Sequence, residues 1–486
     1  MANKALLFDL IQSLSRSEKR YFKLHCVQTG TATNYLKLFE AIARQSSYDE
    51  QALRAQFAGE TFIKQLHVTK NYLRNLILKS LRNFHAQISK DAVLKDVLRN
   101  IEILFHKELY ASCEAELKKA ESLAQMYELY PGMVEIATWR RKLTQAQTPH
   151  NYQVFLKEMV DQQGTIDRLK NINQYWQLAI RISKETISRG NHPVQDDQLL
   201  QDVGNAQSLE ATLLHYNACY FQHLQQNERD AAEDTLYDLI AYLEKHPARI
   251  EEDPSMYASS INNFVSFLVF QKKHQPALML VQRAKNMYKQ WKIVSERKTL
   301  FKQIMRTFNI ELEIYRDTRS LEGKEAFISE IEQFVLKNRY KMPTSYLLSF
   351  WFQLANIHFI QRNFEQALLW INEILNTRYR DVRIDLQIHA RMMNLMIHLE
   401  QQNLFVLRYF VDSTRRFLKK QRHIATHESV LLKFFSSIAQ TPVMDYKKKF
   451  EELDRALFPD NNTPPAFSAL DYIDYKQWIA EQIASS

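Results

Sequence analysis

Residues 346–376, with the sequence YLLSFWFQLANIHFIQRNFEQALLWINEILN, carry the pattern that most constrains the fold of this chain. Large apolar residues recur every three or four positions on both sides of the polar run QRN, as amphipathic α-helices require. Ala355 and Ala367 supply small side chains where two such helices would touch. The segment therefore predicts a helical hairpin, and its weaker copies elsewhere predict a stack of hairpins.

Glycine is scarce, with 7 among 486 residues. Average usage would place about 34 glycines in a chain of this length. Tight β-hairpin turns, bulges and phosphate-binding loops depend on glycine because they need a positive φ or close approach of the backbone. The scarcity argues against β-sheets and nucleotide-binding loops. The chain is also too long for one compact core, whereas a repeat array needs each unit to pack only on its neighbours.

Four segments align as helix pairs. The best-formed pair has Trp351, Leu354 and Ala355 in its first helix and Ala367, Ile371 and Ile374 in its second. The equivalent residues 90 positions earlier are Ile261, Phe264, Val265, Ala277, Val281 and Ala284. Those 254 positions earlier are Val97, Asn100, Ile101, Cys113, Leu117 and Ala120. Those 40 positions later are Arg391, Asn394, Leu395, Leu407, Val411 and Thr414. A further pair, with Ile314 and Tyr315 followed by Phe327, Ile331 and Phe334, precedes Trp351.

This arrangement of large, small and packing residues resembles the tetratricopeptide repeat. The units recur at about 40–50 residues instead of 34, so the chain resembles a divergent member of the tetratricopeptide-like superfamily, most clearly over residues 255–420. The resemblance implies an all-α, right-handed solenoid of about twenty helices. The runs SLSRSEKRYFKLH, YLKLFEAI and NYLRNLILKSLRNF also resemble the opening of a group of uncharacterised bacterial proteins, and that resemblance brings no function with it.

Three regions are expected: a basic helical N-terminal subdomain over 1–90, the hairpin array over 91–457, and a loop with a C-terminal capping helix over 458–486. The subdomain should contain helices at 17–27, 33–44, 48–57 and 62–88, and the capping helix should cover 467–483. Side chains that could cap helix starts are paired as Ser15 with Glu18, Ser47 with Glu50, and Ser468 with Asp471.

Tetratricopeptide-like arrays bind extended peptides or helices in a concave groove lined by the first helix of each pair. Transferring the groove positions of that family gives Asn262, Ser266, Phe352, Asn356, His389, Met392 and Met396. Asparagine offers a donor and an acceptor to a peptide backbone, and methionine suits adaptable apolar recognition. The plainer alternative is that these residues pack or line an inner surface. The expected function is a non-catalytic scaffold or adaptor that binds a protein or peptide partner.

The alternative function is nucleic-acid binding. Residues 61–90 contain six basic residues and no acidic one, and Arg74, Lys79 and Arg82 lie away from the leucine face at 100° per residue. Such a face could follow phosphates, and the short helices before it allow a helix-turn-helix reading, with the array as sensor or dimerisation platform. Charged helix faces are more often simply solvated. A second basic face, at Arg415, Arg416, Lys419, Lys420 and Arg422, is partly explained by the helix dipole.

Enzyme motifs are missing: the sequence has no Gly-x-Ser-x-Gly, no Gly-Lys-Ser/Thr and no His-Glu-x-x-His. We therefore expect no catalysis and no cofactor. Two groups, His215 with Cys219 and His223, and His423 with His427, have helical spacing without the remaining zinc ligands, so no metal is expected. Three scattered cysteines, no signal-peptide pattern and no run of about 18 apolar residues predict a cytoplasmic protein outside the membrane.

Overall fold

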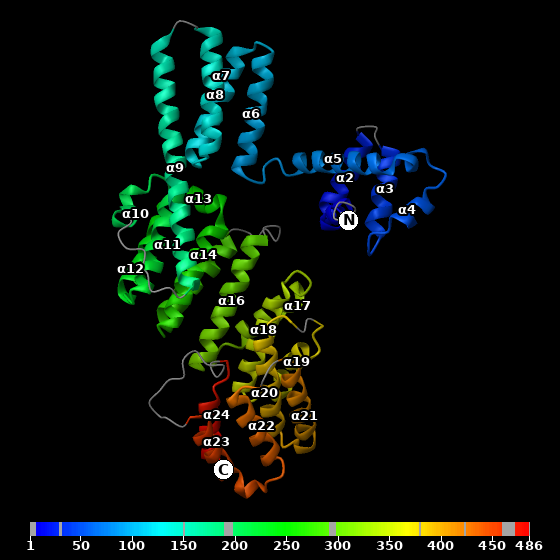
Figure 1. Cartoon of the computed structure of the whole chain (residues 1–486), viewed down its shortest axis with the longest axis vertical. Coiled ribbons are helices and arrows are strands. Elements are labelled where there is room, and N and C mark those ends of the chain that lie inside the picture. Colours follow the sequence, from blue (N-terminus) through cyan, green and yellow to red (C-terminus); the bar gives the residue numbers. More distant parts are fainter. Residues whose placement is uncertain are drawn as a thin grey trace. The chain divides into compact units, whose positions relative to one another are not determined.

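A computed structural model describes residues 6–28, 32–148, 151–188, 198–290, 298–378, 381–421, 424–458 and 472–485. Within these ranges the chain forms twenty-four α-helices, three short 3-10 helices and no strand, so the predicted all-α class is confirmed (Figure 1). The contacts divide the chain into two compact units. One contains Met1–Ala232 and His246–Glu252, and the other contains Glu233–Lys245 and Asp253–Ser486.

The first unit begins with a group of short helices that share one hydrophobic core. They are α1 (Leu6–Ser13), α2 (Arg16–Gln28), α3 (Ala32–Arg44), α4 (Glu50–Gln56), the 3-10 helix η1 (Thr61–Gln65) and α5 (Leu66–Phe84). Every member of their core lies between Leu7 and Leu81, and the buried rings of Phe22 and Phe39 pack against each other with centroids 4.7 Å apart and planes 45° apart. The helix predicted over 62–88 is thus divided between η1 and α5, and it ends where His85 leaves helical geometry.

Of the two helix caps predicted in this region, one is confirmed and one is wrong. The backbone N–H of Glu18 donates to Ser15 Oγ at 3.2 Å, and the N–H of Ser15 donates to Glu18 Oε2 at 2.6 Å, so the first capping box is confirmed. The cap at Ser47 is wrong. Asp49 caps α4 instead, because its Oδ1 accepts from the N–H of Ala52 at 2.9 Å, while Glu50 accepts hydrogen bonds from basic side chains.

The remainder of the first unit consists of five longer helices that pack on their neighbours along the chain, and of three short elements. They are α6 (Lys90–His106), α7 (Tyr110–Met126), α8 (Tyr130–Gln147), α9 (Tyr152–Ser188), α10 (Gln198–Gln201), η2 (Val203–Asn205), α11 (Leu209–Gln225) and α13 (Pro247–Glu252). The aligned residues Ile101, Cys113 and Leu117 are fully buried between α6 and α7.

The second unit contains a succession of helix pairs. After α12 (Arg229–Glu244), whose residues 233–244 belong to this unit, come α14 (Pro254–Phe270), α15 (His274–Gln290), α16 (Lys298–Thr318), α17 (Glu325–Asn338), α18 (Thr344–Ile360), α19 (Phe364–Leu375), α20 (Ile384–Glu400), α21 (Leu404–Gln421), α22 (Thr426–Ile438), η3 (Val443–Asp445), α23 (Tyr446–Leu457) and α24 (Tyr475–Ser485). Ala355 and Ala367 are fully buried in α18 and α19, which contact each other. The first helices of the pairs, α14, α16, α18 and α20, also contact one another in succession.

One turn recurs between paired helices. Arg362, between α18 and α19, has φ 58°, and the aligned residues Lys272, Glu108 and Gln402 have φ 60°, 59° and 57°. After Arg362, the N–H of Asn363 donates to the carbonyl of His358 at 2.8 Å, which is the closing bond of a Schellman turn. These four turns therefore have a residue other than glycine at the left-handed position, so scarce glycine is compatible with tight helical hairpins.

The last described helix differs from its prediction. It begins at Tyr475 instead of 467, and Asp474 Oδ1 accepts from the N–H of Gln477 at 3.0 Å. The predicted cap of Ser468 and Asp471 lies outside the described residues. None of the helices in the described ranges combines the length and the apolar character needed to cross a membrane.

Candidate functional site

The seven predicted groove residues lie on the first helices of three pairs: Asn262 and Ser266 on α14, Phe352 and Asn356 on α18, and His389, Met392 and Met396 on α20. Six of these residues are buried, with at most 4% of their surface exposed, and Ser266 is partly exposed. The set therefore does not form an open face, and its role in peptide binding stays a prediction.

Three of the buried residues contact the chain's own C-terminal segment at Tyr472. Asn356 Nδ2 donates to the backbone carbonyl of Tyr472 at 2.9 Å. The ring of Tyr472 stacks on His389 with centroids 4.6 Å apart and planes 25° apart, and it meets Phe352 edge-on at 6.1 Å. An asparagine, a histidine and a phenylalanine on α18 and α20 thus hold one residue of a returning segment by its backbone and by its ring.

A charged pair at the start of α20 holds the hydroxyl of the same tyrosine. Tyr472 OH donates to Asp385 Oδ2 at 2.9 Å, and Arg383 Nη2 donates to that oxygen at 2.7 Å. Burial alone would raise the pKa of Asp385, but the hydrogen bonds from Arg383 and Tyr472 outweigh burial and keep the pKa below its ordinary value. The carboxylate therefore stays ionised at neutral pH and remains an acceptor for the tyrosine.

Helix α24 continues this segment and anchors it at Trp478. The Trp478 ring is 2% exposed and packs on Phe434, Phe435 and Phe450, with centroids 5.3–6.4 Å apart. Its Nε1 donates to Glu400 Oε1 at 2.7 Å. Tyr475 and Ile479 of this helix are also buried. Local periodicity did not reveal the role of Trp478, because its partners lie on helices more than 25 residues earlier in the sequence.

A row of partly exposed polar side chains lies on the same layer of first helices; we call it the inner polar row, and it comprises Asn263, Ser266, Arg306, Asn309 and Ser349. Arg306 on α16 donates to Asn263 Oδ1 at 2.8 Å and to Ser266 Oγ at 3.0 Å, both on α14. Ser349 Oγ on α18 lies 2.8 Å from Asn309 Oδ1 on α16 and donates to it. All five of these side chains keep some exposure to solvent.

Beneath the inner polar row, Asn262 has a structural role. Its Nδ2 donates to the carbonyl of Gln303 at 3.0 Å, and its Oδ1 accepts from Thr307 Oγ1 at 2.8 Å. The Tyr288 hydroxyl lies 2.8 Å from the same threonine, and burial raises the pKa of Tyr288 to about 12. Asn262 therefore joins α14 to α16 below the surface, in agreement with the plainer alternative that this residue has a packing role.

The basic residues of 61–90 divide into two groups. Lys70 donates to Glu50 Oε2 at 2.8 Å and to Tyr48 OH at 2.9 Å, and Lys90 lies over the Tyr127 ring. In contrast, Lys64, Arg74, Lys79 and Arg82 are exposed, and they have no hydrogen-bond or ion-pair partner among the described residues.

The histidine groupings have local partners. His215 Nδ1 lies 2.9 Å from the carbonyl of Leu199, and Cys219 Sγ lies 3.5 Å from His215 Nε2. Burial raises the pKa of Cys219 to about 11, so its thiol is protonated at neutral pH. His423 lies outside the described residues. Among the residues that the structure describes, no group of three or more potential ligands could hold a metal ion.

Searches against family models, curated proteins and solved structures find no match to this chain.

Proposed function

We propose that this protein is a non-catalytic scaffold or adaptor, acting in the cytoplasm, whose layer of first helices binds a peptide or helix of a protein partner. Its hairpins would form a divergent tetratricopeptide-like, right-handed solenoid, with α14, α16, α18 and α20 on the binding side. The inner polar row supplies donors and acceptors there. The recurrent left-handed turn at aligned positions supports the repeat relationship.

The contact between Asn356 and Tyr472 carries this proposal. Asparagine holds the backbone carbonyl of the segment, while His389 and Phe352 contact its aromatic side chain. Hydrogen bonds to a partner's backbone give affinity, and a pocket for one of its side chains gives specificity, when a protein binds an extended peptide. The chain's own segment therefore occupies one part of the layer, and the inner polar row next to it on α14, α16 and α18 remains partly exposed.

Peptide capture can be tested with a synthetic peptide of residues 472–485 and a chain that ends at residue 471. We expect the peptide to bind this shortened chain and to raise its melting temperature, because the peptide replaces contacts that the segment makes in the intact chain. A matched peptide with Tyr472→Ala should bind at least tenfold more weakly, since it loses the ring stack and the bond to Asp385. Equal binding of the two peptides would remove the basis for backbone-and-ring capture on α18 and α20.

Partner binding can be tested by affinity purification from the native cell after nuclease treatment. The bait variant Arg306→Ala/Asn309→Ala removes two members of the inner polar row, and the control Leu369→Ala/Phe405→Ala changes side chains on α19 and α21 that are 58% and 88% exposed. The scaffold function predicts that protein partners bind the wild type and the control but are lost from the Arg306 variant. If all three baits retain the same proteins, the inner polar row is not the binding surface.

The alternative, nucleic-acid binding, concerns the N-terminal helices and rests on the distribution of charge there.

A further inference from the structure

The positive charge of this chain is concentrated at one end. Residues 1–90 contain fourteen lysines and arginines and six acidic residues, whereas the whole chain has a net charge of +9. Eight of the nine excess positive charges therefore lie in fewer than a fifth of the residues. A charged helix face that is merely solvated needs no such imbalance, whereas a polyanion-binding domain does.

Most of the carboxylates in this region already pair with basic side chains of the same region. Four of the six acidic residues accept from basic side chains of the same region: Glu18 from His85, Glu40 from Lys23, Glu50 from Lys70 and Arg54, and Glu60 from Lys37, all at 2.6–2.9 Å. The hydrogen bonds from Lys70 and Arg54 lower the pKa of Glu50 to about 2. These four carboxylates contact other basic side chains, so none of them pairs with the exposed cations of η1 and α5.

The unpaired cations share a surface with hydrogen-bonding side chains. On α5, Arg74, Lys79 and Arg82 fall within an arc of about 140° that also contains Asn71 and Asn75, at 100° per residue. All five of these side chains are exposed. We call this surface the α5 basic face. Arginine and lysine bind phosphates, and asparagine can bond to adenine in the major groove, so this face combines the two kinds of contact that duplex DNA offers.

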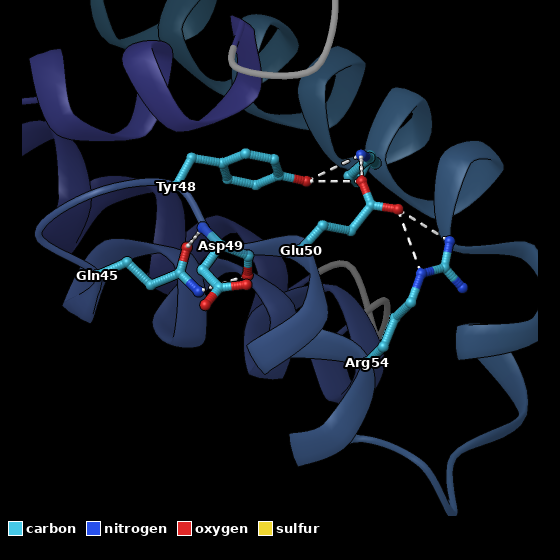
Figure 2. A network of polar contacts seen from close by, with 6 residues as sticks. Gln45, Tyr48, Asp49, Glu50 and Arg54 are labelled. Carbon is cyan, nitrogen blue, oxygen red and sulfur yellow. Dashed lines mark hydrogen bonds and ion pairs between the residues drawn. The ribbon is translucent and has the colours of Figure 1, made fainter.

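The opposite side of α5 fixes the orientation of that face. Leu66, Leu73 and Ile77 are buried in the N-terminal core with at most 1% exposure. Residues 57–65, which include η1, connect α4 to α5. Glu50 of α4 and Tyr48 both accept from Lys70 of α5. Figure 2 shows Tyr48 and Glu50 at this contact, with Arg54 on the other carboxylate oxygen of Glu50. The arrangement is a short helix, a connection that contains η1, and a longer helix whose outer face is basic. Helix-turn-helix domains have the same order of two helices, with a shorter connection than here.

We propose that residues 6–84 form a DNA-binding domain and that α5 enters the major groove of double-stranded DNA, with Arg74, Lys79, Arg82 and Lys64 contacting phosphates. Helix α5 has 19 residues, a length of about 28 Å at 1.5 Å per residue. That is enough to span the groove and reach phosphates on both sides. The deep, narrow major groove of an RNA duplex does not admit a helix, so the geometry favours DNA over double-stranded RNA.

The proposal is tested by fluorescence anisotropy with the full-length chain and a 25-base-pair DNA duplex at several salt concentrations. We expect the chain to bind the duplex, and the logarithm of its association constant should fall linearly with the logarithm of the salt concentration. The variant Arg74→Glu/Arg82→Glu should bind at least tenfold more weakly, and its salt slope should fall by about 2, since each phosphate contact contributes about 0.9. A milder variant, Arg74→Gln/Arg82→Gln, should show the same direction with a smaller loss.

The matched control is Lys419→Glu/Lys420→Glu, which makes the same change in net charge at two exposed residues of α21. It should leave DNA affinity within twofold of the wild type. Equal losses in variant and control would show that net charge alone is responsible, and this would overturn the assignment to α5. Binding to an RNA duplex of the same sequence that matches or exceeds binding to DNA would also overturn it. So would binding to vesicles containing phosphatidylserine in the absence of DNA binding, because the ligand would then be a lipid surface.

Discussion

At the scale of single residues, the recurrent left-handed turn is where the chain departs most from ordinary preferences. A non-glycine residue in this conformation costs roughly 1–2 kcal/mol, because its Cβ approaches the following carbonyl oxygen. Gln402 adopts φ 57° between α20 and α21, and its side chain is exposed. The sequence marks these turns only by polar runs such as QRN and QQN. It could not reveal their backbone geometry, because no glycine stands at the left-handed position.

Gln402→Gly should therefore stabilise the protein. Glycine removes the steric cost but adds freedom to the unfolded chain, so the net gain in the free energy of unfolding should be about 0.5–1 kcal/mol. The control is Gln401→Gly, since Gln401 has φ −81° and needs no glycine. This control should lose about 0.5–1 kcal/mol. Urea denaturation of the three proteins measures both changes, and a loss of stability in Gln402→Gly would contradict a strained turn.

At the scale of elements, the sequence predicts what local periodicity determines. The helices of the pairs, and the burial of Ala355 and Ala367, follow from apolar spacing alone. The return of the C-terminal segment does not: Asn356 and Tyr472 are 116 residues apart, and no periodic signal connects them. The capping helix was expected, but its start and its anchor at Trp478 depend on helices that it meets only after folding.

The anchor of α24 gives a prediction at this scale. Trp478→Phe keeps an aromatic ring against Phe434 and Phe450 but removes the donor to Glu400, whose side chain is 7% exposed. Gln482 of the same helix still donates to the same carboxylate oxygen at 2.6 Å, so the loss of this one hydrogen bond should cost about 1 kcal/mol. Hydrogen exchange of residues 475–485 should therefore accelerate. The control Gln477→Ala changes an exposed side chain of the same helix and should have an effect within about 0.5 kcal/mol. Unchanged exchange in Trp478→Phe would mean that the hydrogen bond from Trp478 to Glu400 does not hold the helix.

At the scale of the whole molecule, successive helix pairs predict that a local defect spreads to its neighbours and then fades. In repeat arrays each unit is stabilised mainly by the interfaces with adjacent units. Helices α16, α18 and α20 contact in this order, and α19 contacts both α18 and α20. In contrast, the core of α1 to α5 is built entirely from residues between Leu7 and Leu81. The two regions should therefore respond differently to damage in one hairpin.

Ala367→Leu creates such damage, because Ala367 is fully buried where α19 packs against α18. Forcing three more carbon atoms into this contact should cost about 1–3 kcal/mol of stability. Hydrogen exchange measured along the chain should rise most in α18 and α19, less in α16 and α21, and not at all in α1 to α5. Leu369→Ala, at a residue of the same helix that is 58% exposed, should leave exchange unchanged everywhere. A uniform rise from α1 to α24 in Ala367→Leu would instead mean that the chain unfolds as one cooperative body, and stability would then not be a sum over neighbouring hairpins.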